Sequence, residues 1–331
     1  MSARRPPKVV AFGGGHGLSA TLSALRTVTP DLTAVVTVAD DGGSSGVIRS
    51  ELGTLPPGDL RMALAALAGE DEQSQLWAQL CQHRFGGGGT LDGHPVGNLI
   101  LTGLDQLTGD TVAALDAVGR LLGAAGRVLP LSVEPLEIIA DVAGLDPADP
   151  TRPVEVRGQV AVATTPGSVL SVRIDPPYAT ACPEAVEAVM AADWVILGPG
   201  SWFTSVIPHL LVSDMAKALS MTPARRLVVL NLSSHDTETE GFSPATHLEV
   251  LAAHAPRIEL DVVLAGRRSV TEGSEALEAA AKSLGAELVV AQLGDDSGRP
   301  MHDPRRLAAA YSSILTTTDL TTTDEGDATW R

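Results

Sequence analysis

The chain opens with an apolar segment, residues 9–12, that runs into a glycine-rich turn at residues 13–17 and then into a helix rich in alanine and leucine. Glycine lets a backbone bend sharply and approach a ligand closely, and the N–H groups that begin the following helix attract an anion. This order of strand, turn and helix predicts an α/β fold with a phosphate-binding site at the turn. The turn lacks the Gly-Lys-Ser/Thr of a P-loop, and Leu18 replaces the last glycine of a dinucleotide-binding motif.

A second predicted strand, residues 32–38, is followed by Asp40 and Asp41 and then by Gly-Gly-Ser-Ser-Gly. Because the carboxyl ends of neighbouring parallel strands lie side by side, we expect both carboxylates to face the first glycine turn. There they could accept a hydrogen bond from a ribose hydroxyl or hold a divalent cation against a diphosphate. The alternative is that this segment only turns the chain.

A third turn follows a predicted strand at residues 193–197. It begins at Gly198, contains Pro199, Gly200 and Ser201, and leads into a segment that bears hydroxyl groups. Three such turns on one edge of one sheet would form a single crevice for a phosphorylated ligand.

Strand and helix patterns alternate along most of the chain, which predicts a Rossmann-like, mostly parallel sheet with helices on both faces. Between about residues 129 and 174 the pattern changes to short β runs, expected at 138–142, 154–163 and 170–174. We therefore predict one domain over residues 8–315 with a small antiparallel β insertion. Residues 86–89, four glycines, are expected to form a hairpin or lid, and the polar residues 316–331 a disordered tail.

The net charge of −17 argues against nonspecific binding to nucleic acid or to anionic membranes, because both depend on a basic surface. The two cysteines are too few for a disulfide framework or a metal cluster. The N-terminus has no apolar run typical of a signal peptide, and no apolar stretch reaches membrane-spanning length. These features predict a cytoplasmic protein.

Five motifs occur in order along the chain: the glycine turn at 13–17, Asp-Asp-Gly-Gly-Ser-Ser-Gly at 40–46, Pro-Gly-Asp-x-Arg at 57–61, His-x-x-Gly-Asn at 94–98, and Gly-Pro-Gly-Ser-x-x-Thr-Ser at 198–205. With these motifs the chain resembles the bacterial gluconeogenesis-factor proteins, which are homologous to 2-phospho-L-lactate transferase. The resemblance runs from about residue 8 to residue 315.

The resemblance implies a crevice that binds a UDP-sugar such as UDP-N-acetylglucosamine. It also implies a regulatory role in cell shape and wall synthesis during gluconeogenic growth, through a protein partner. The alternative is a transferase that uses Mg²⁺ and moves a phospholactyl group from a nucleotide diphosphate carrier. We find no nucleophile elbow and no zinc-ligand spacing, which fits either reading. An NAD-dependent oxidoreductase is disfavoured by Leu18 and by the turn at Gly198. The chain could also form a homo-oligomer.

The candidate ligand-binding residues are Gly13, Gly14, Gly15, His16, Gly17, Asp40, Asp41, Gly42, Ser44, Ser45, Asp59, Arg61, Asn98, Gly198, Gly200, Ser201, Thr204, Ser205 and Asn231. Asp40 and Asp41 are metal ligands only in the transferase reading. Some residues have simpler interpretations: Asp59 could cap a helix, Arg61 could pair with a surface carboxylate, and His94 could be a general base or an ordinary loop residue. Trp202 and Phe203 could stack on a base or pack in the core.

Overall fold

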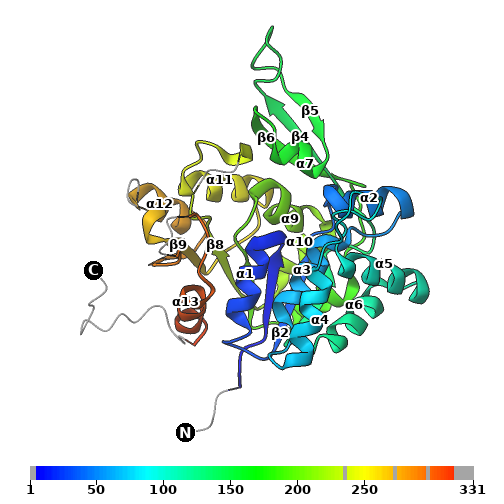
Figure 1. The fold of residues 1–331 in the computed structure, drawn as a ribbon. Helices are drawn as coiled ribbons and strands as arrows, with labels where there is room; N and C mark the ends of the chain where they lie inside the picture. Colours follow the sequence, from blue (N-terminus) through cyan, green and yellow to red (C-terminus); the bar gives the residue numbers. More distant parts are fainter. Residues whose placement is uncertain (1–4, 234–236, 271–273, 296–298, 317–331) are drawn as a thin grey trace.

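The computed structural model describes residues 5–233, 237–270, 274–295 and 299–316 (Figure 1). Its main layer is a seven-stranded parallel sheet in the order β10-β9-β8-β7-β1-β2-β3. The strands are β1 (Val9–Gly13), β2 (Leu32–Val36), β3 (Arg127–Pro130), β7 (Trp194–Leu197), β8 (Arg225–Val229), β9 (Val262–Gly266) and β10 (Glu287–Ala291). The prediction of a Rossmann-like parallel sheet is confirmed.

Strand β1 lies near the middle of this sheet and is the point where the strand order reverses. It pairs with β2 on one side and with β7 on the other. Every residue of β1, β7 and β9 is buried, as expected for parallel strands that are covered on both faces. At such a reversal, the connections that leave two neighbouring strands run to opposite faces of the sheet. This leaves a crevice at the carboxyl ends of the two strands.

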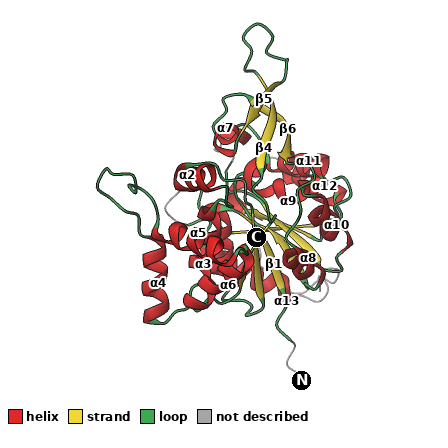
Figure 2. Ribbon diagram, turned by 90° about the vertical axis from the view of Figure 1, so that its right-hand side faces the viewer, coloured by secondary structure: helices red, strands yellow, loops and turns green. Residues whose placement is uncertain are grey.

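Helices cover both faces of the sheet, with α3, α4, α5 and α6 on one side and α8, α10, α11 and α12 on the other (Figure 2). The helices outside the insertion are α1 (Gly15–Leu25), α2 (Gly43–Leu52), α3 (Pro57–Leu67), α4 (Glu72–Gln82), α5 (Val96–Thr108), α6 (Thr111–Leu121), α8 (Pro183–Met190), α9 (Pro208–Leu211), α10 (Ser213–Met221), α11 (Pro244–His254), α12 (Ser274–Ser283) and α13 (Pro304–Thr316). Short helical turns are η1 (Trp202–Val206), η2 (Thr237–Thr239) and η3 (Arg267–Ser269). The last helix, α13, packs against α1.

Local signals explain where several helices begin. Asp110 accepts hydrogen bonds from the backbone N–H groups of Val112 and Ala113 at the start of α6. Helix α3 begins at Pro57, a residue suited to a first helical position because it has no N–H to satisfy. The expectation that Asp59 caps this helix is therefore wrong, because Asp59 lies inside the first turn and its side chain is available to the crevice.

A three-stranded antiparallel sheet, the insertion, projects from the main body at the top of Figure 1. It consists of β4 (Glu137–Ala143), β5 (Val154–Arg157), helix α7 (Gln159–Ala163) and β6 (Ser168–Asp175). The small antiparallel insertion is thus confirmed, with two corrections. Residues 127–130 belong to the main sheet, and residues 159–163 are helical because Gly158 turns the chain with φ +97° after β5.

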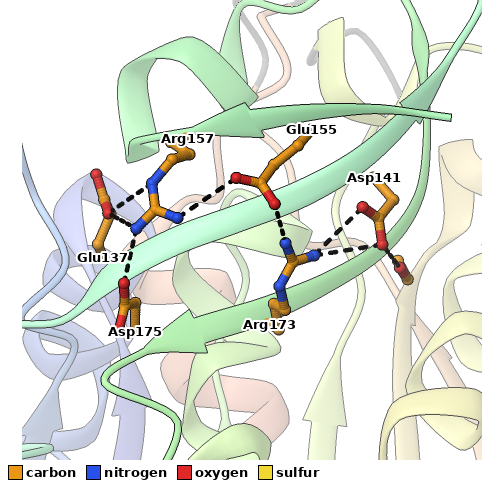
Figure 3. A network of polar contacts seen from close by, with 7 residues as sticks. Glu137, Asp141, Glu155, Arg157, Arg173 and Asp175 are labelled. Carbon is orange, nitrogen blue, oxygen red and sulfur yellow. Dashed lines mark hydrogen bonds and ion pairs between the residues drawn. The ribbon is translucent and has the colours of Figure 1, made fainter.

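The exposed face of the insertion carries a network of ion pairs (Figure 3). Two pairs of acidic residues face each other across the strands, and arginines lie between them: Glu137 and Asp175 are bridged by Arg157, and Asp141 and Glu155 are bridged by Arg173. Each exposed ion pair stabilises the fold by at most about 1 kcal/mol. Their main effect is to offset the repulsion between like charges that stand opposite each other.

Two further expectations concern loops. The glycine loop at residues 86–89 lies in a hairpin closed by a bridge between Arg84 and Pro95, as expected for a hairpin. None of its glycines lines the cavity described below, so it is not a lid over that cavity. Of the predicted tail, residues 317–331 lie outside the described residues.

Candidate functional site

A cavity of about 440 Å³ lies at the carboxyl ends of the neighbouring strands β1 and β7. It is lined by Gly14, Gly15, His16, Gly17, Ala20, Asp40, Asp59, Gln159, Pro199, Gly200, Ser201, Ser205, Asn231, Leu232, Ser233, Pro300, Met301 and His302. The three turns that the sequence singles out thus meet at one cavity. Its volume lies within the range of small-molecule sites, which is roughly 300–1,000 Å³.

The first and third turns touch each other directly at Gly17. A Cβ atom on Gly17 would lie 1.9 Å from the carbonyl oxygen of Pro199 and 3.1 Å from the Cα of Gly200. No residue with a side chain fits between two backbones at that distance, so glycine is required. The contact joins the start of α1 to the turn after β7, and both segments line the cavity.

Asn231 holds the third turn from the end of the neighbouring strand, β8. Its Oδ1 accepts a hydrogen bond from the N–H of Gly200 at 2.9 Å, and its Nδ2 donates to the carbonyl oxygen of Gly200 at 2.8 Å. The side-chain amide therefore pairs with the backbone of Gly200 as a residue of a neighbouring strand would, and this pairing fixes the turn. Ser201 and Ser205, which flank this turn, also line the cavity.

Two carboxylates, Asp40 and Asp59, face the first glycine turn. The N–H of Gly15 donates to Asp59, and a Cβ on Gly14 would lie 2.5 Å from Asp59 Oδ2. Burial, and next the nearby charge of Asp40, raises the pKa of Asp59 to about 7. Asp40 Oδ1 accepts from the N–H of Gly42 at 2.9 Å. At neutral pH, a substantial fraction of Asp59 therefore carries a proton beside the glycine turn.

Asp41 does not line the cavity. Its Oδ1 accepts a hydrogen bond at 2.9 Å from the N–H of Val160 in helix α7 of the insertion. The two adjacent carboxylates thus face different partners, and the residue that accompanies Asp40 in the cavity is Asp59 from α3.

Four other polar residues form a chain beside the cavity rather than in its wall. Arg61 Nε donates to Asn98 Oδ1 at 2.9 Å, Asn98 Nδ2 donates to Ser44 Oγ at 3.0 Å, and Ser44 Oγ lies 2.8 Å from His94 Nδ1. Arg61 is buried, and burial, followed by the charge of Arg84, lowers its pKa to about 10. Arg61 is therefore not the surface side chain of the simpler interpretation.

The remaining predicted residues support the turns from behind. Ser45 Oγ accepts from the N–H of Gly58 at 3.0 Å and so ties α2 to the start of α3. Trp202, Phe203 and Thr204 are buried in η1, so the two aromatic side chains pack in the core. Those of the predicted residues that do not line the cavity are Gly13, Asp41, Gly42, Ser44, Ser45, Arg61, Asn98, Gly198 and Thr204.

Eight lining residues are absent from the set predicted from the sequence: Ala20, Gln159, Pro199, Leu232, Ser233, Pro300, Met301 and His302. His302 hydrogen-bonds the backbone of Leu230, and burial lowers its pKa to about 4, so its imidazole is neutral. Its Nε2 is buried without a hydrogen-bond partner among the described residues. The His-Asp-Pro at 302–304, where the last helix begins, could have pointed to this wall. Gln159 stands in a predicted strand and gave none.

Comparisons with known proteins show the family of this chain. Residues 9–294 match the family model of 2-phospho-L-lactate transferase CofD. The chain belongs to the CofD family. A Mycobacterium tuberculosis protein named "Putative gluconeogenesis factor" is 56% identical over 308 residues, covering 92% of this chain and 90% of the relative. A Listeria monocytogenes protein named "Gluconeogenesis factor" is 34% identical over 325 residues, covering 95% and 98%.

A protein of known structure is similar over most of the chain. The crystal structure of a UPF0052 family protein from Bacillus halodurans superposes with a TM-score of 0.81 at 31% identity, covering 93% of this chain and 99% of the other. The resemblance to gluconeogenesis-factor proteins stated from the motifs is confirmed.

Among the described residues of this CofD-family chain, no cluster of three or more His, Cys, Asp or Glu side chains is placed to hold a metal ion. Any cation at Asp40 and Asp59 would therefore need oxygens from the ligand as well. Nor does the described part of the chain contain a helix with the length and apolarity to cross a membrane.

Proposed function

We propose that this protein binds a nucleotide diphosphate sugar of the UDP-sugar class, such as UDP-N-acetylglucosamine, in the cavity at the carboxyl ends of β1 and β7. The observation that carries the proposal is the direct contact of two glycine turns in a cavity of about 440 Å³, beside the start of helix α1. Backbone N–H groups at such a helix start bind phosphates without any basic side chain.

We further infer that binding serves regulation rather than turnover. The relatives named gluconeogenesis factor support a role in growth on gluconeogenic carbon sources. In our proposal the ligand-bound protein acts in the cytoplasm on a partner of cell-wall synthesis and so affects cell shape. The lining residues include no serine or cysteine nucleophile with a paired histidine base, which suits binding without a covalent step.

The test is calorimetry of the purified chain with UDP-N-acetylglucosamine, UDP-glucose, UDP, GDP and NAD. We expect a single site that prefers the uridine nucleotides, with the sugar nucleotide unchanged when recovered afterwards. Binding of NAD or GDP alone would contradict the proposal. So would the absence of heat with every uridine nucleotide.

The second candidate is a Mg²⁺-dependent transferase of the phospholactyl type. Asp40 and Asp59 favour it, because two half-buried carboxylates that line one cavity can be neutralised by a divalent cation. Mg²⁺ is commonly held by one or two carboxylates together with ligand phosphates. The ion would neutralise diphosphate charge, while the glycine turns would orient the phosphates. The metal pair we propose is Asp40 with Asp59, because Asp41 binds the insertion instead.

The pH dependence of binding separates the two candidates. Without metal, a diphosphate binds best when Asp59 is protonated, so affinity should rise as pH falls through about 7. With Mg²⁺ held by Asp59, the carboxylate must be ionised, so affinity should rise as pH increases. Titrations at pH 6 and pH 8, with and without Mg²⁺, decide between them. Product formation with a deazaflavin acceptor and Mg²⁺ would establish the transferase.

A further inference from the structure

The insertion contributes one side chain to the cavity. Of residues 137–175, all of which are described, only Gln159 lines it. Gln159 is the first residue of α7, between β5 and β6 of the projecting sheet. Its primary amide offers two donors and one acceptor oxygen, and it carries no charge. It therefore differs from the backbone N–H groups of the glycine turns, which only donate.

Gln159 is held in place by the residues on either side of it. The N–H of Val160 donates to Asp41 Oδ1 at 2.9 Å. Gly158 has φ +97°, and a Cβ there would lie 2.3 Å from Asp41 Oδ2. On the other side of the junction, a Cβ on Gly42 would lie 2.9 Å from Val160 Cγ2. The start of α7 is thus docked closely on the loop that follows β2.

This docking brings Gln159 and Asp40 to the same part of the cavity wall. Asp40 is the chain neighbour of Asp41, Gln159 is the chain neighbour of Val160, and both Asp40 and Gln159 line the cavity. A carboxylate accepts hydrogen bonds and an amide both accepts and donates. Together they complement hydroxyl groups, whereas the glycine turns complement phosphate oxygens.

We propose that Gln159 and Asp40 form the subsite for the hydroxyl-bearing sugar of the ligand, and that Asp41 is a positioning residue that holds Gln159 there. This assignment rests on the proposed function, because it divides a nucleotide diphosphate sugar between two walls of one cavity. The diphosphate lies on the glycine turns of the main body. The sugar hydroxyl groups hydrogen-bond to Gln159 of the insertion and to Asp40.

The first experiment compares UDP-N-acetylglucosamine with UDP, which lacks the sugar. Gln159→Leu removes the amide and keeps a similar side-chain volume. We expect it to lower the affinity for the sugar nucleotide about threefold to tenfold, the effect of one lost hydrogen bond. Affinity for UDP should not change. The matched control is Gln106→Leu on the exposed side of α5, which should bind both ligands like the wild type.

The second experiment tests the positioning role of Asp41. Asp41→Ala should reproduce the selective loss of sugar-nucleotide affinity, and Asp41→Asn, whose Oδ1 can still accept from Val160, should restore most of it. The double variant Asp41→Ala/Gln159→Leu should be no weaker than Gln159→Leu alone. Thermal melting of each variant shows whether the protein remains folded. The comparison of the two ligands is a second control, because a merely structural defect would lower the affinities for UDP and for the sugar nucleotide equally.

Three outcomes would overturn the assignment. If Gln159→Leu lowers the affinities for UDP and for UDP-N-acetylglucosamine equally, the amide does not contact the sugar. The same conclusion follows if neither affinity changes. Additive losses in the double variant would deny the positioning role of Asp41. A wild-type protein that binds neither uridine nucleotide is a different result, since it refutes the proposed function itself and this subsite with it.

Discussion

At the residue scale, the site depends on a glycine whose Cα touches another backbone. Gly17→Ala would place a methyl group 1.9 Å from the carbonyl oxygen of Pro199, so the first and third turns must separate. We expect a loss of about 1–3 kcal/mol in the free energy of unfolding, the usual cost of overpacking, together with loss of ligand binding. Urea denaturation and calorimetry measure the two effects.

The control for this substitution is Gly103→Ala in the exposed part of α5, where a Cβ would meet nothing within 4 Å. Alanine is the better helix former by about 1 kcal/mol, so this variant should be more stable and should bind ligand normally. A Gly17→Ala protein with wild-type stability and affinity would show that the two turns are not in contact.

Asp59 gives a second prediction at this scale, on stability and pH. Its pKa is raised from 3.8 to about 7 in the folded protein, so its contribution to stability is present below about pH 4 and is lost as pH rises through about 7. Asp59→Asn should remove this pH-dependent loss of stability, because the asparagine side chain does not ionise. At about 1.4 kcal/mol per pKa unit, we expect the variant to be more stable than the wild type at pH 8 by roughly 2–4 kcal/mol.

Urea denaturation at pH 5 and pH 8 measures this difference, with Glu259→Gln, an exposed carboxylate, as the control. The gain from Asp59→Asn should be small at pH 5 and large at pH 8. An equal gain at both values would mean that Asp59 titrates normally in the folded protein.

At the element scale, the strands and turns of the main sheet could be predicted because their signals are local. Strands β1 and β7 are short apolar runs that lead into glycine turns, so their type and their position at the crevice follow from the sequence. The carboxylate pair could not be predicted in this way. Asp40 lines the cavity, whereas Asp41 contacts the insertion, and the second carboxylate comes from α3.

Helix α7 shows why the rest required the structure. Its sequence, Gln-Val-Ala-Val-Ala, is mostly apolar and contains β-branched valines at every second position, as a strand can. The turn at Gly158 and the hydrogen bond from Val160 to Asp41 make it helical instead. Both depend on a contact between residues that are 119 positions apart in the chain, which no local pattern reveals. The same contact brings Gln159 into the cavity.

A prediction at this scale concerns the start of α6. Asp110 accepts hydrogen bonds from two backbone N–H groups that would otherwise be unsatisfied. Asp110→Ala should lower the free energy of unfolding by about 1 kcal/mol, and Asp110→Asn should retain most of it because asparagine is an equally good cap. Ligand affinity should not change in either variant. Chemical denaturation measures the free energy of unfolding of each variant. The prediction is wrong if Asp110→Ala and Asp110→Asn are equally stable.

At the scale of the whole molecule, the net charge of −17 opposes the approach of an anionic ligand. Salt screens this long-range repulsion, with a Debye length of about 30 Å at 0.01 M and about 8 Å at 0.15 M. We therefore expect the association rate of a UDP-sugar to rise with ionic strength, the reverse of a basic nucleotide site. Stopped-flow measurements from 0.01 to 0.2 M salt test this, with uncharged uridine as the comparison. A rate that falls with salt would contradict it.

The cavity is lined by residues that lie far apart in the chain, from Gly14 to His302. During synthesis the first glycine turn therefore waits for Pro300, Met301 and His302 before the cavity is complete. A fragment that ends before residue 300 lacks this wall even if its strands have already paired, so we expect such a fragment to bind the proposed ligand more weakly than the chain described here.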